Sequence, residues 1–132
     1  LRVELDVDLA GAGEEQNTRL LPEIENAIYR LVQETLTNVS KHALTDRATV
    51  SIRDANGSVV VEVRDEGIGF DLDEAVGGFG LIGMRERADL VDGKLTVAST
   101  RGVGTTVTVV VPAKRIGDGA PVRDSAGGES RD

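Results

Sequence analysis

A carboxylate at the end of a valine-rich strand constrains this chain more than any other feature. The residues before it alternate, and one face of the strand carries Val59, Val61 and Val63. The other face carries Glu62 and Arg64, so the two-residue period of a strand turns Asp65 toward the apolar side. Because an unpaired buried charge costs roughly several kcal/mol, an inward Asp65 requires a hydrogen-bond donor from the protein, an ordered water or a ligand.

Two glycines follow this carboxylate. Gly67 and Gly69 place no side chain beside Asp65, so a flat ring could approach the backbone there, or the chain could turn through positive φ. A purine amino group is one donor that would suit the carboxylate. The alternative, from these residues alone, is an ordinary Asp-Glu-Gly surface turn. The rest of the sequence has to separate the two interpretations.

Length and charge narrow the class of protein. The 132 residues suffice for one domain with one core, and the absence of cysteine excludes disulfides, thiolate metal sites and a cysteine nucleophile. A net charge of −8 and an aromatic content of 2% argue against a nucleic-acid partner. A polyphosphate site in so acidic a chain would need a divalent cation together with backbone N–H groups. No apolar run approaches the roughly 18 residues of a membrane span.

Alternating hydrophobicity predicts strands over residues 1–9, 48–55, 58–65, 94–100 and 105–111. The first is expected to be half-buried, with an apolar face made of Leu1, Val3, Leu5, Val7 and Leu9. Asn56-Gly57 favours a type I′ turn, so the second and third strands should form a hairpin.

Helical spacing predicts a long helix over residues 23–43 and a shorter one over residues 84–91. At about 100° per residue, one face of the long helix collects Ile24, Ile28, Leu31, Val32, Thr35 and Val39. These elements favour an α+β fold, a two-layer α/β sandwich in which a mixed, mainly antiparallel sheet of about five strands carries helices on one face. Residues 1–112 should form this domain, and residues 113–132 are expected to be a disordered tail.

A polar ridge borders the apolar stripe of the long helix. Glu34, Asn38 and Lys41 lie at i, i+4 and i+7, with His42 close by. The ridge alone is typical of an ordinary polar flank, and His42 could serve packing or complement the charge of the helix C-terminus. Asn38 favours a functional interpretation, because a mid-helix Asn is mildly unfavourable and its amide oxygen suits a hard cation.

A glycine-rich segment separates the third strand from the second helix. Residues 72–76 within it are short and acidic, which predicts a mobile lid. Gly78 and Gly80 then precede a helix, an arrangement that can seat a phosphate on free N–H groups or can be a plain flexible connector. Later in the chain, Thr105 shares the parity of the inward valines, so its hydroxyl should be buried and Asp65 is the expected partner.

Taken together and in order, these segments resemble the boxes of the histidine-kinase, gyrase and Hsp90-type ATPase superfamily. Residues 34–43 resemble its N box, 65–69 its first glycine box, 78–81 its second, and 102–106 its final Gly-Thr motif. Residues 33–43 and 80–87 are most similar to sensor histidine kinases paired with NarL-type response regulators. The resemblance implies the ATP-binding (Bergerat) fold and the catalytic domain of a two-component protein histidine kinase.

The resemblance also implies a role for each matching residue. Asp65 would bind the adenine amino group, with Gly67 and Gly69 forming the slot for the base and Thr105 supporting Asp65 through a hydrogen bond or a water. Asn38 would ligate Mg²⁺, and Glu34 would position or deprotonate a group during transfer. Lys41 and His42 would lie near the phosphates, and Gly78 and Gly80 would form the hinge of the lid on the phosphate side. Leu81 would also belong to the nucleotide site. The implied cofactors are ATP and Mg²⁺.

The phosphoacceptor histidine of such kinases lies on a separate dimerising domain, so this chain should bind ATP without autophosphorylating. The implied partners are that domain and a NarL-type response regulator. The resemblance implies that this chain is a monomer by itself and that the full-length protein is a homodimer. It also implies a cytoplasmic domain of a sensor kinase that is either membrane-bound or soluble. Two departures stand out, Asp92-Gly93 in place of the usual Gly-Gly and Leu44-Thr45 in place of small residues. The alternatives are an anti-sigma-factor serine kinase or nucleotide-gated interaction module of the same superfamily, and a structural domain that binds no nucleotide.

Overall fold

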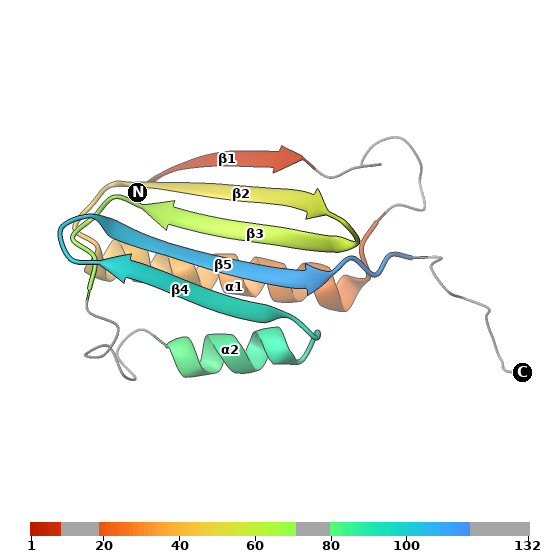
Figure 1. Ribbon diagram of the computed structural model, residues 1–132. Coiled ribbons are helices and arrows are strands. Elements are labelled where there is room, and N and C mark those ends of the chain that lie inside the picture. Colours follow the sequence, from red (N-terminus) through yellow and green to blue (C-terminus); the bar gives the residue numbers. More distant parts are fainter. Residues whose placement is uncertain (9–18, 71–79, 117–132) are drawn as a thin grey trace, which may run out of the picture.

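The computed structural model describes residues 1–8, 19–70 and 80–116. Seven elements follow one another in the order β1 (Arg2–Asp8), α1 (Pro22–His42), β2 (Arg47–Ala55), β3 (Ser58–Asp65), α2 (Leu81–Asp89), β4 (Lys94–Thr100) and β5 (Gly104–Pro112). The five strands form one sheet in the order β1-β2-β3-β5-β4 (Figure 1). Only the β1–β2 pair is parallel, so the sheet is mixed and mainly antiparallel, as predicted.

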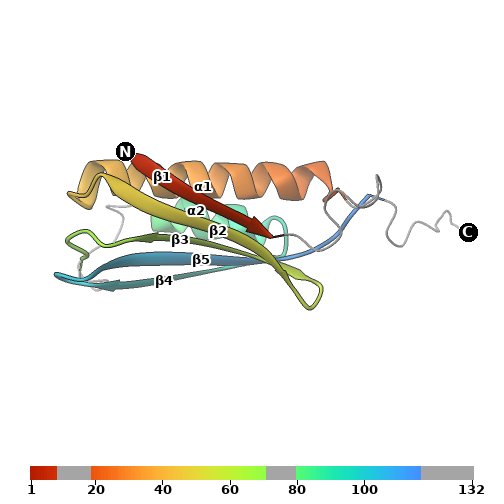
Figure 2. The same ribbon diagram turned by 90° about the horizontal axis from the view of Figure 1, so that it is seen from above.

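Both helices pack on the same face of the sheet (Figure 2). The buried stripe of α1 is the predicted one, with Ala27 added and Val32 only half-buried. It meets the inward valines of β3 and β5 in the main core, which Met84 and Ala88 of α2 complete. The two-layer sandwich predicted from the hydrophobic pattern is therefore confirmed.

The charged residues at the two ends of α1 complement the helix macrodipole. Pro22 opens the helix, and Glu23 and Glu25 lie in its first turn, where negative charge is favourable. Lys41 and His42 lie in the last turn, where positive charge is favourable. The hairpin between β2 and β3 is also as predicted, with φ of +52° at Asn56 and +85° at Gly57.

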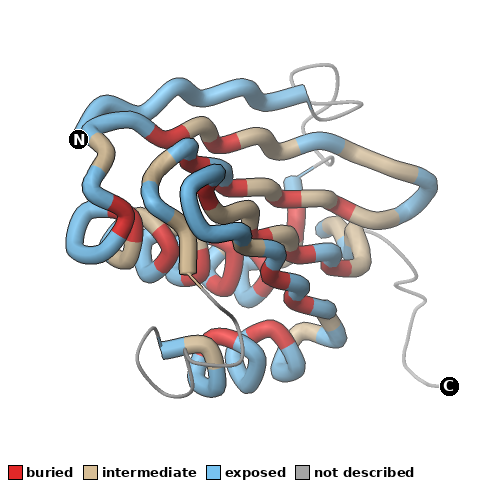
Figure 3. Tube along the Cα trace, turned by 60° about the vertical axis from the view of Figure 1, so that its left-hand side comes forward, coloured by how far each residue is buried: buried red, intermediate tan, exposed pale blue. Residues whose placement is uncertain are grey.

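The first strand departs from its prediction. β1 exists and pairs with β2 in register, but every one of its residues is exposed (Figure 3). Val3 pairs with buried Ala48 and Leu5 with buried Val50, so its apolar side faces the helix layer, yet Leu5 is 66% exposed. The expected half-burial is wrong because no helix among the described residues covers this edge of the sheet.

The described fold continues a few residues past the expected boundary at residue 112. Residues 113–116 lie against the fold, whereas a disordered tail was expected to begin at Ala113. Arg115 forms a bridge with Leu20 and an ion pair with Asp54, at 2.9 Å. The described part of the chain extends through Ile116, and the rest of the predicted tail, from residue 117 onward, lies outside the described residues. No helix that the structure describes is long and apolar enough to cross a membrane.

Candidate functional site

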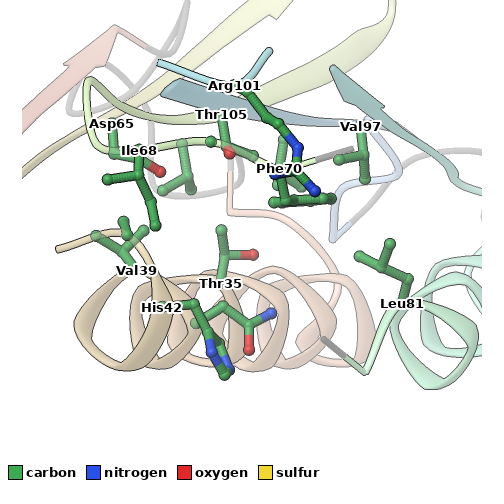
Figure 4. A pocket seen from close by; sticks show the side chains of 15 residues that line it. Thr35, Val39, His42, Asp65, Ile68, Phe70, Leu81, Val97, Arg101 and Thr105 are labelled. Carbon is green, nitrogen blue, oxygen red and sulfur yellow. The ribbon is translucent and has the colours of Figure 1, made fainter. Parts of the chain in front are cut away.

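A cavity of about 290 Å³ lies between α1 and the inner face of the sheet (Figure 4). Most of its wall is apolar, with Val39 and Ala43 from α1 and its end, Val63 from β3, Val97 from β4 and Val107 from β5. A few polar groups converge on it: Thr35, Asn38, His42, Asp65, Arg101 and Thr105. An apolar cavity with a small number of oriented polar groups is typical of a small-molecule site.

Asp65 is the buried acid of this cavity. Its side chain points inward as the strand parity predicted, and the residue is 6% exposed. The backbone N–H of Gly67 donates to Oδ1 at 2.8 Å, the one hydrogen bond to this carboxylate within the described part of the chain. A carboxylate has about four lone-pair sites, so Asp65 can accept a further donor from the cavity.

The segment after Asp65 is held between two other parts of the molecule. Ile68 N–H donates to the Ala43 carbonyl at 2.9 Å, and the Ile68 carbonyl accepts from Gly102 N–H at 2.7 Å. A Cβ on Gly67 would lie 2.2 Å from the Ala43 oxygen, and one on Gly69 would lie 2.1 Å from the Thr100 oxygen. Both glycines are therefore required by close backbone approach. Gly69 lines the cavity, whereas Gly67 lies outside its lining.

The polar ridge of α1 divides into two parts. Asn38 and His42 line the cavity, whereas Glu34 and Lys41 are exposed and do not. Asn38 Nδ2 lies 4.0 Å from Sδ of Met84, which joins the amide to α2. Glu34 lies near the start of α2, because a Cβ on Gly80 would be 3.4 Å from its Oε2. Glu34 and Asn38 thus lie where the two helices meet.

The start of α2 contains the last predicted residues. Gly80 precedes the helix with a φ of +66°, a left-handed conformation that favours glycine, and Leu81 lines the cavity. Gly78 and the predicted lid at 72–76 lie outside the described residues.

Thr105 lines the cavity, and it pairs directly with Asp65 across strands β5 and β3. Its described hydrogen bond differs from the expected one. Thr105 Oγ1 is 2.7 Å from Ser99 Oγ, and no direct bond to Asp65 occurs among the described residues. A link from Thr105 to Asp65 through a water stays a prediction.

Sequence reasoning did not single out Ser99, Arg101, Ile68 or Phe70. Ser99 shares the inward parity of Leu95 and Val97 on β4, so this signal was present in the sequence. Arg101 lies in a turn, and Figure 4 shows its guanidinium beside Phe70 at the cavity wall. Nothing in the local sequence pattern indicates that position.

The residues present fit a magnesium ion that is bound together with a phosphate. The described residues contain no group of three or more His, Asp or Glu that could enclose a metal by itself. Mg²⁺ usually takes one or two protein oxygens and completes its shell with water and substrate phosphates. The side-chain oxygens of Asn38 and of nearby Glu34 are ligands of that kind.

The fold is an α/β sandwich in which an inward acid on a central strand and a helix amide both line one apolar cavity, an arrangement typical of a small-molecule site. Residues 23–115 match the family described as histidine kinase-, DNA gyrase B- and HSP90-like ATPases. The chain belongs to this family.

The relatives place the chain among histidine kinases. It is 40% identical over 104 residues to the signal transduction histidine-protein kinase/phosphatase DegS of Bacillus subtilis, covering 76% of this chain and 27% of DegS. It is 45% identical over 92 residues to the oxygen sensor histidine kinase NreB of Staphylococcus carnosus, covering 68% of this chain and 26% of NreB. The chain therefore spans about a quarter of the length of these relatives.

Solved structures agree on the fold. The blue-light activated histidine kinase EL346 of Erythrobacter litoralis superposes with a TM-score of 0.63 at 26% identity, over 86% of this chain and 36% of that one. The chain is thus a histidine-kinase-type ATP-binding domain.

Proposed function

We propose that this domain positions Mg²⁺-ATP for phosphoryl transfer to a histidine on a dimerisation domain outside these 132 residues. The observation that carries the proposal is the buried Asp65 carboxylate, which faces an apolar cavity and has a single described donor. The 6-amino group of adenine is a donor of the right kind, and the valines around the cavity suit the flat faces of the base.

The roles of the other residues follow from their places around the cavity. Gly69 leaves room for the base beside Asp65, while Gly67 allows the preceding turn to form. Asn38 ligates Mg²⁺ from α1. Lys41 and His42 lie near the phosphates, Gly78 and Gly80 form the hinge of the lid on the phosphate side, and Leu81 contacts the nucleotide. Of these, His42 and Leu81 line the cavity.

Catalysis in such a site is mostly positioning and electrostatic stabilisation. The apolar wall keeps water from the base, and Asp65 fixes the direction in which the nucleotide enters. Mg²⁺, when bound, neutralises the negative charge that develops on the phosphate oxygens. Glu34 would position or deprotonate the attacking imidazole, and its exposure at the junction of α1 and α2 supports this role.

The proposed partners belong to the whole protein. The acceptor histidine lies on the dimerisation domain, so the domain described here is a monomer and the full-length protein a homodimer. The phosphoryl group then passes to a NarL-type response regulator, and the domain works in the cytoplasm. The resemblance of residues 33–43 and 80–87 to kinases of this type supports these assignments.

The phosphoryl-transfer proposal is tested by incubating the full-length protein with labelled ATP and Mg²⁺. We expect a phosphoprotein that is labile in acid and stable in alkali, as phosphohistidine is, and that Asp65→Asn prevents. A well-folded full-length protein that binds ATP without ever producing such a species would reject kinase activity while leaving the nucleotide site intact.

The metal assignment makes a separate prediction for Asn38→Ala. ATP should bind the unmodified domain more tightly with Mg²⁺ than with EDTA, by about tenfold or more, because the ion links the triphosphate to the protein. The variant should bind equally under both conditions in calorimetry. Gln33→Ala, an exposed change on the same helix, is the matched control and should keep the full Mg²⁺ effect. An Mg²⁺ effect that survives in Asn38→Ala would remove this residue from the metal site.

A further inference from the structure

Arg101 brings a positive charge to the wall of the cavity. Among the described residues that line the cavity, it is the one whose side chain is always positively charged. The other ionisable side chains of this wall are those of Asp65 and His42. ATP carries several negative charges, and the chain that has to bind it has a net charge of −8. A fixed cation at the wall would offset part of that repulsion, and the proposed function assigns it no role.

A closed turn fixes the backbone of Arg101 beside the cavity. The Val103 N–H donates to the Thr100 carbonyl at 3.0 Å, and Gly102, within the turn, has a φ of +80°. The Gly102 N–H also donates to the Ile68 carbonyl at 2.7 Å, which fastens the turn to the segment after β3. Because this backbone is already held in place, a contact between Arg101 and a ligand does not require the turn to become ordered.

The side chain of Arg101 lies along the cavity wall. In Figure 4, Asp65 and Ile68 are on one side of the cavity, Leu81 is on the other, and the Arg101 guanidinium is between them, beside Phe70. A guanidinium next to an aromatic ring is a favourable arrangement. Arg101 is exposed as a whole residue, so the cation is accessible to a ligand that enters from solvent.

This position corresponds to one part of the nucleotide. The proposed function places the base at Asp65 and the phosphates toward the start of α2, where Leu81 lies. The ribose and the phosphate attached to it, the α-phosphate, lie between the base and the terminal phosphate. We propose that Arg101 binds the α-phosphate through charge-assisted hydrogen bonds from its guanidinium. The inference rests on the proposed function and deepens it, because it adds a phosphate ligand from the β4–β5 turn.

The chemistry of arginine suits this contact. Its planar fork can donate two N–H groups to phosphate oxygens while its face stays against Phe70. The structural alternative is that Arg101 only covers Phe70 and closes the wall. Cover of that kind would support the base and every phosphorylated ligand equally, whereas a phosphate contact would leave the bare nucleoside unaffected.

The test compares adenosine with AMP, ADP and ATP, because only adenosine lacks the α-phosphate. Each ligand is titrated into the 132-residue chain and its variants Arg101→Gln and Arg101→Lys, with EDTA present so that no metal ion contributes. NMR chemical shifts give the Kd values, since they report weak binding as well as tight binding. Arg64→Gln is the matched control, because it removes the same charge from an exposed arginine on the opposite face of the sheet.

We expect Arg101→Gln to weaken AMP, ADP and ATP by a similar factor, about fivefold to twentyfold, and to leave adenosine within about twofold. The factor is shared because each of the three nucleotides has one α-phosphate. Arg101→Lys keeps the charge without the fork and should stay within about threefold for all ligands. The loss in Arg101→Gln should shrink at about 0.5 M NaCl, because salt screens an exposed cation. Arg64→Gln should bind all four ligands within about twofold of the unmodified chain.

Three results would overturn the proposal. Equal losses for adenosine and AMP would make Arg101 a wall residue only. A loss for ADP and ATP without one for AMP would place the contact on a later phosphate, and unchanged binding of all four ligands in Arg101→Gln would exclude any contact. If Asp65→Asn abolishes ATP binding while Arg101→Gln binds every ligand normally, only this inference fails. If the unmodified chain binds no ATP even with Mg²⁺, the proposed function itself fails.

Discussion

At the scale of single residues, the site depends on backbone packing as much as on side-chain chemistry. Asp65 is held by the N–H of Gly67, and Gly67 can be there because it has no Cβ to meet the Ala43 carbonyl. Gly104 has the same function on the next strand, since a Cβ there would lie 2.2 Å from the Asp65 carbonyl oxygen. The position of the Asp65 carboxylate therefore depends on its strand and also on Gly67 and Gly104, which allow the neighbouring backbone segments to pack closely around it.

Two glycine substitutions distinguish the energetic cost of steric crowding from the cost of an unfavourable backbone conformation. Gly102 and Gly104 both have positive φ, +80° and +138°, but the position of a Cβ on Gly102 is open. Gly102→Ala should cost about 1–2 kcal/mol of stability in urea unfolding, from its left-handed conformation alone. Gly104→Ala should cost at least about 3 kcal/mol or prevent folding, because β5 must move away from β3 as well. Equal losses in the two variants would contradict this close approach.

At the scale of residues, the sequence could predict the direction of a side chain wherever the two-residue period of a strand determines it. The inward direction of Asp65 and Thr105 came from the two-residue period, and the same rule applies to Ser99. The hydrogen-bond partner of Thr105 could not be predicted, because Asp65 and Ser99 flank it on two neighbouring strands and the choice depends on rotamers. Arg101 was missed because a turn residue has no period from which to argue.

At the scale of elements, α1 and β1 show what a hydrophobic pattern does and does not indicate. The stripe of α1 predicted its buried face correctly, because a helix in a two-layer fold has only the sheet to pack against. The alternation of β1 predicted a strand and its apolar side, and both are observed. It could not predict burial, which requires a neighbouring element to cover that side.

The exposure of β1 predicts that substitutions at two paired apolar residues, Leu5 and Val50, have different effects on stability. Leu5→Thr should change the free energy of unfolding by less than about 0.5 kcal/mol, because this side chain is 66% exposed. Val50→Thr, at its partner position on β2, should cost about 1–3 kcal/mol, because Val50 is 2% exposed and the new hydroxyl would be buried. Chemical denaturation of both variants measures the contrast. A large loss for Leu5→Thr would mean that β1 is buried in solution.

At the scale of the whole molecule, the segment that precedes α1 is joined to the segment that follows β5. The Leu21 N–H donates to the Lys114 carbonyl at 2.9 Å, and the Ile116 N–H donates to the Arg19 carbonyl at 2.8 Å. Arg115 Nη2 contacts both carboxylate oxygens of Asp54 near the β2–β3 hairpin, at 2.9 and 3.1 Å. The packing of residues 113–116 could not be predicted from hydrophobicity, because their hydrogen bonds and ion pair are polar contacts with residues distant in the chain.

Arg115→Gln should therefore destabilise the whole domain. Its ion pair with Asp54 is only 16% and 18% exposed, so breaking it leaves a half-buried carboxylate without its partner, at a cost of about 1–3 kcal/mol. The matched control is Lys114→Gln, whose ion pair with Asp92 is 55% and 73% exposed and should contribute less than about 0.5 kcal/mol. Thermal unfolding of the two variants distinguishes them, and similar melting temperatures would show that the Arg115 contact is not maintained in solution.

The central claim is that Asp65 binds the adenine of ATP, and calorimetric titration of ATP with Mg²⁺ into Asp65→Asn tests it most directly. The unmodified domain should bind, and the variant should lose about 2–4 kcal/mol of binding free energy, because an amide cannot replace the charged acceptor at a buried position. Glu62→Gln makes the same chemical change on the outer face of β3 and should leave binding unchanged. ATP binding by a folded Asp65→Asn domain with the affinity of the Glu62→Gln domain would contradict the account.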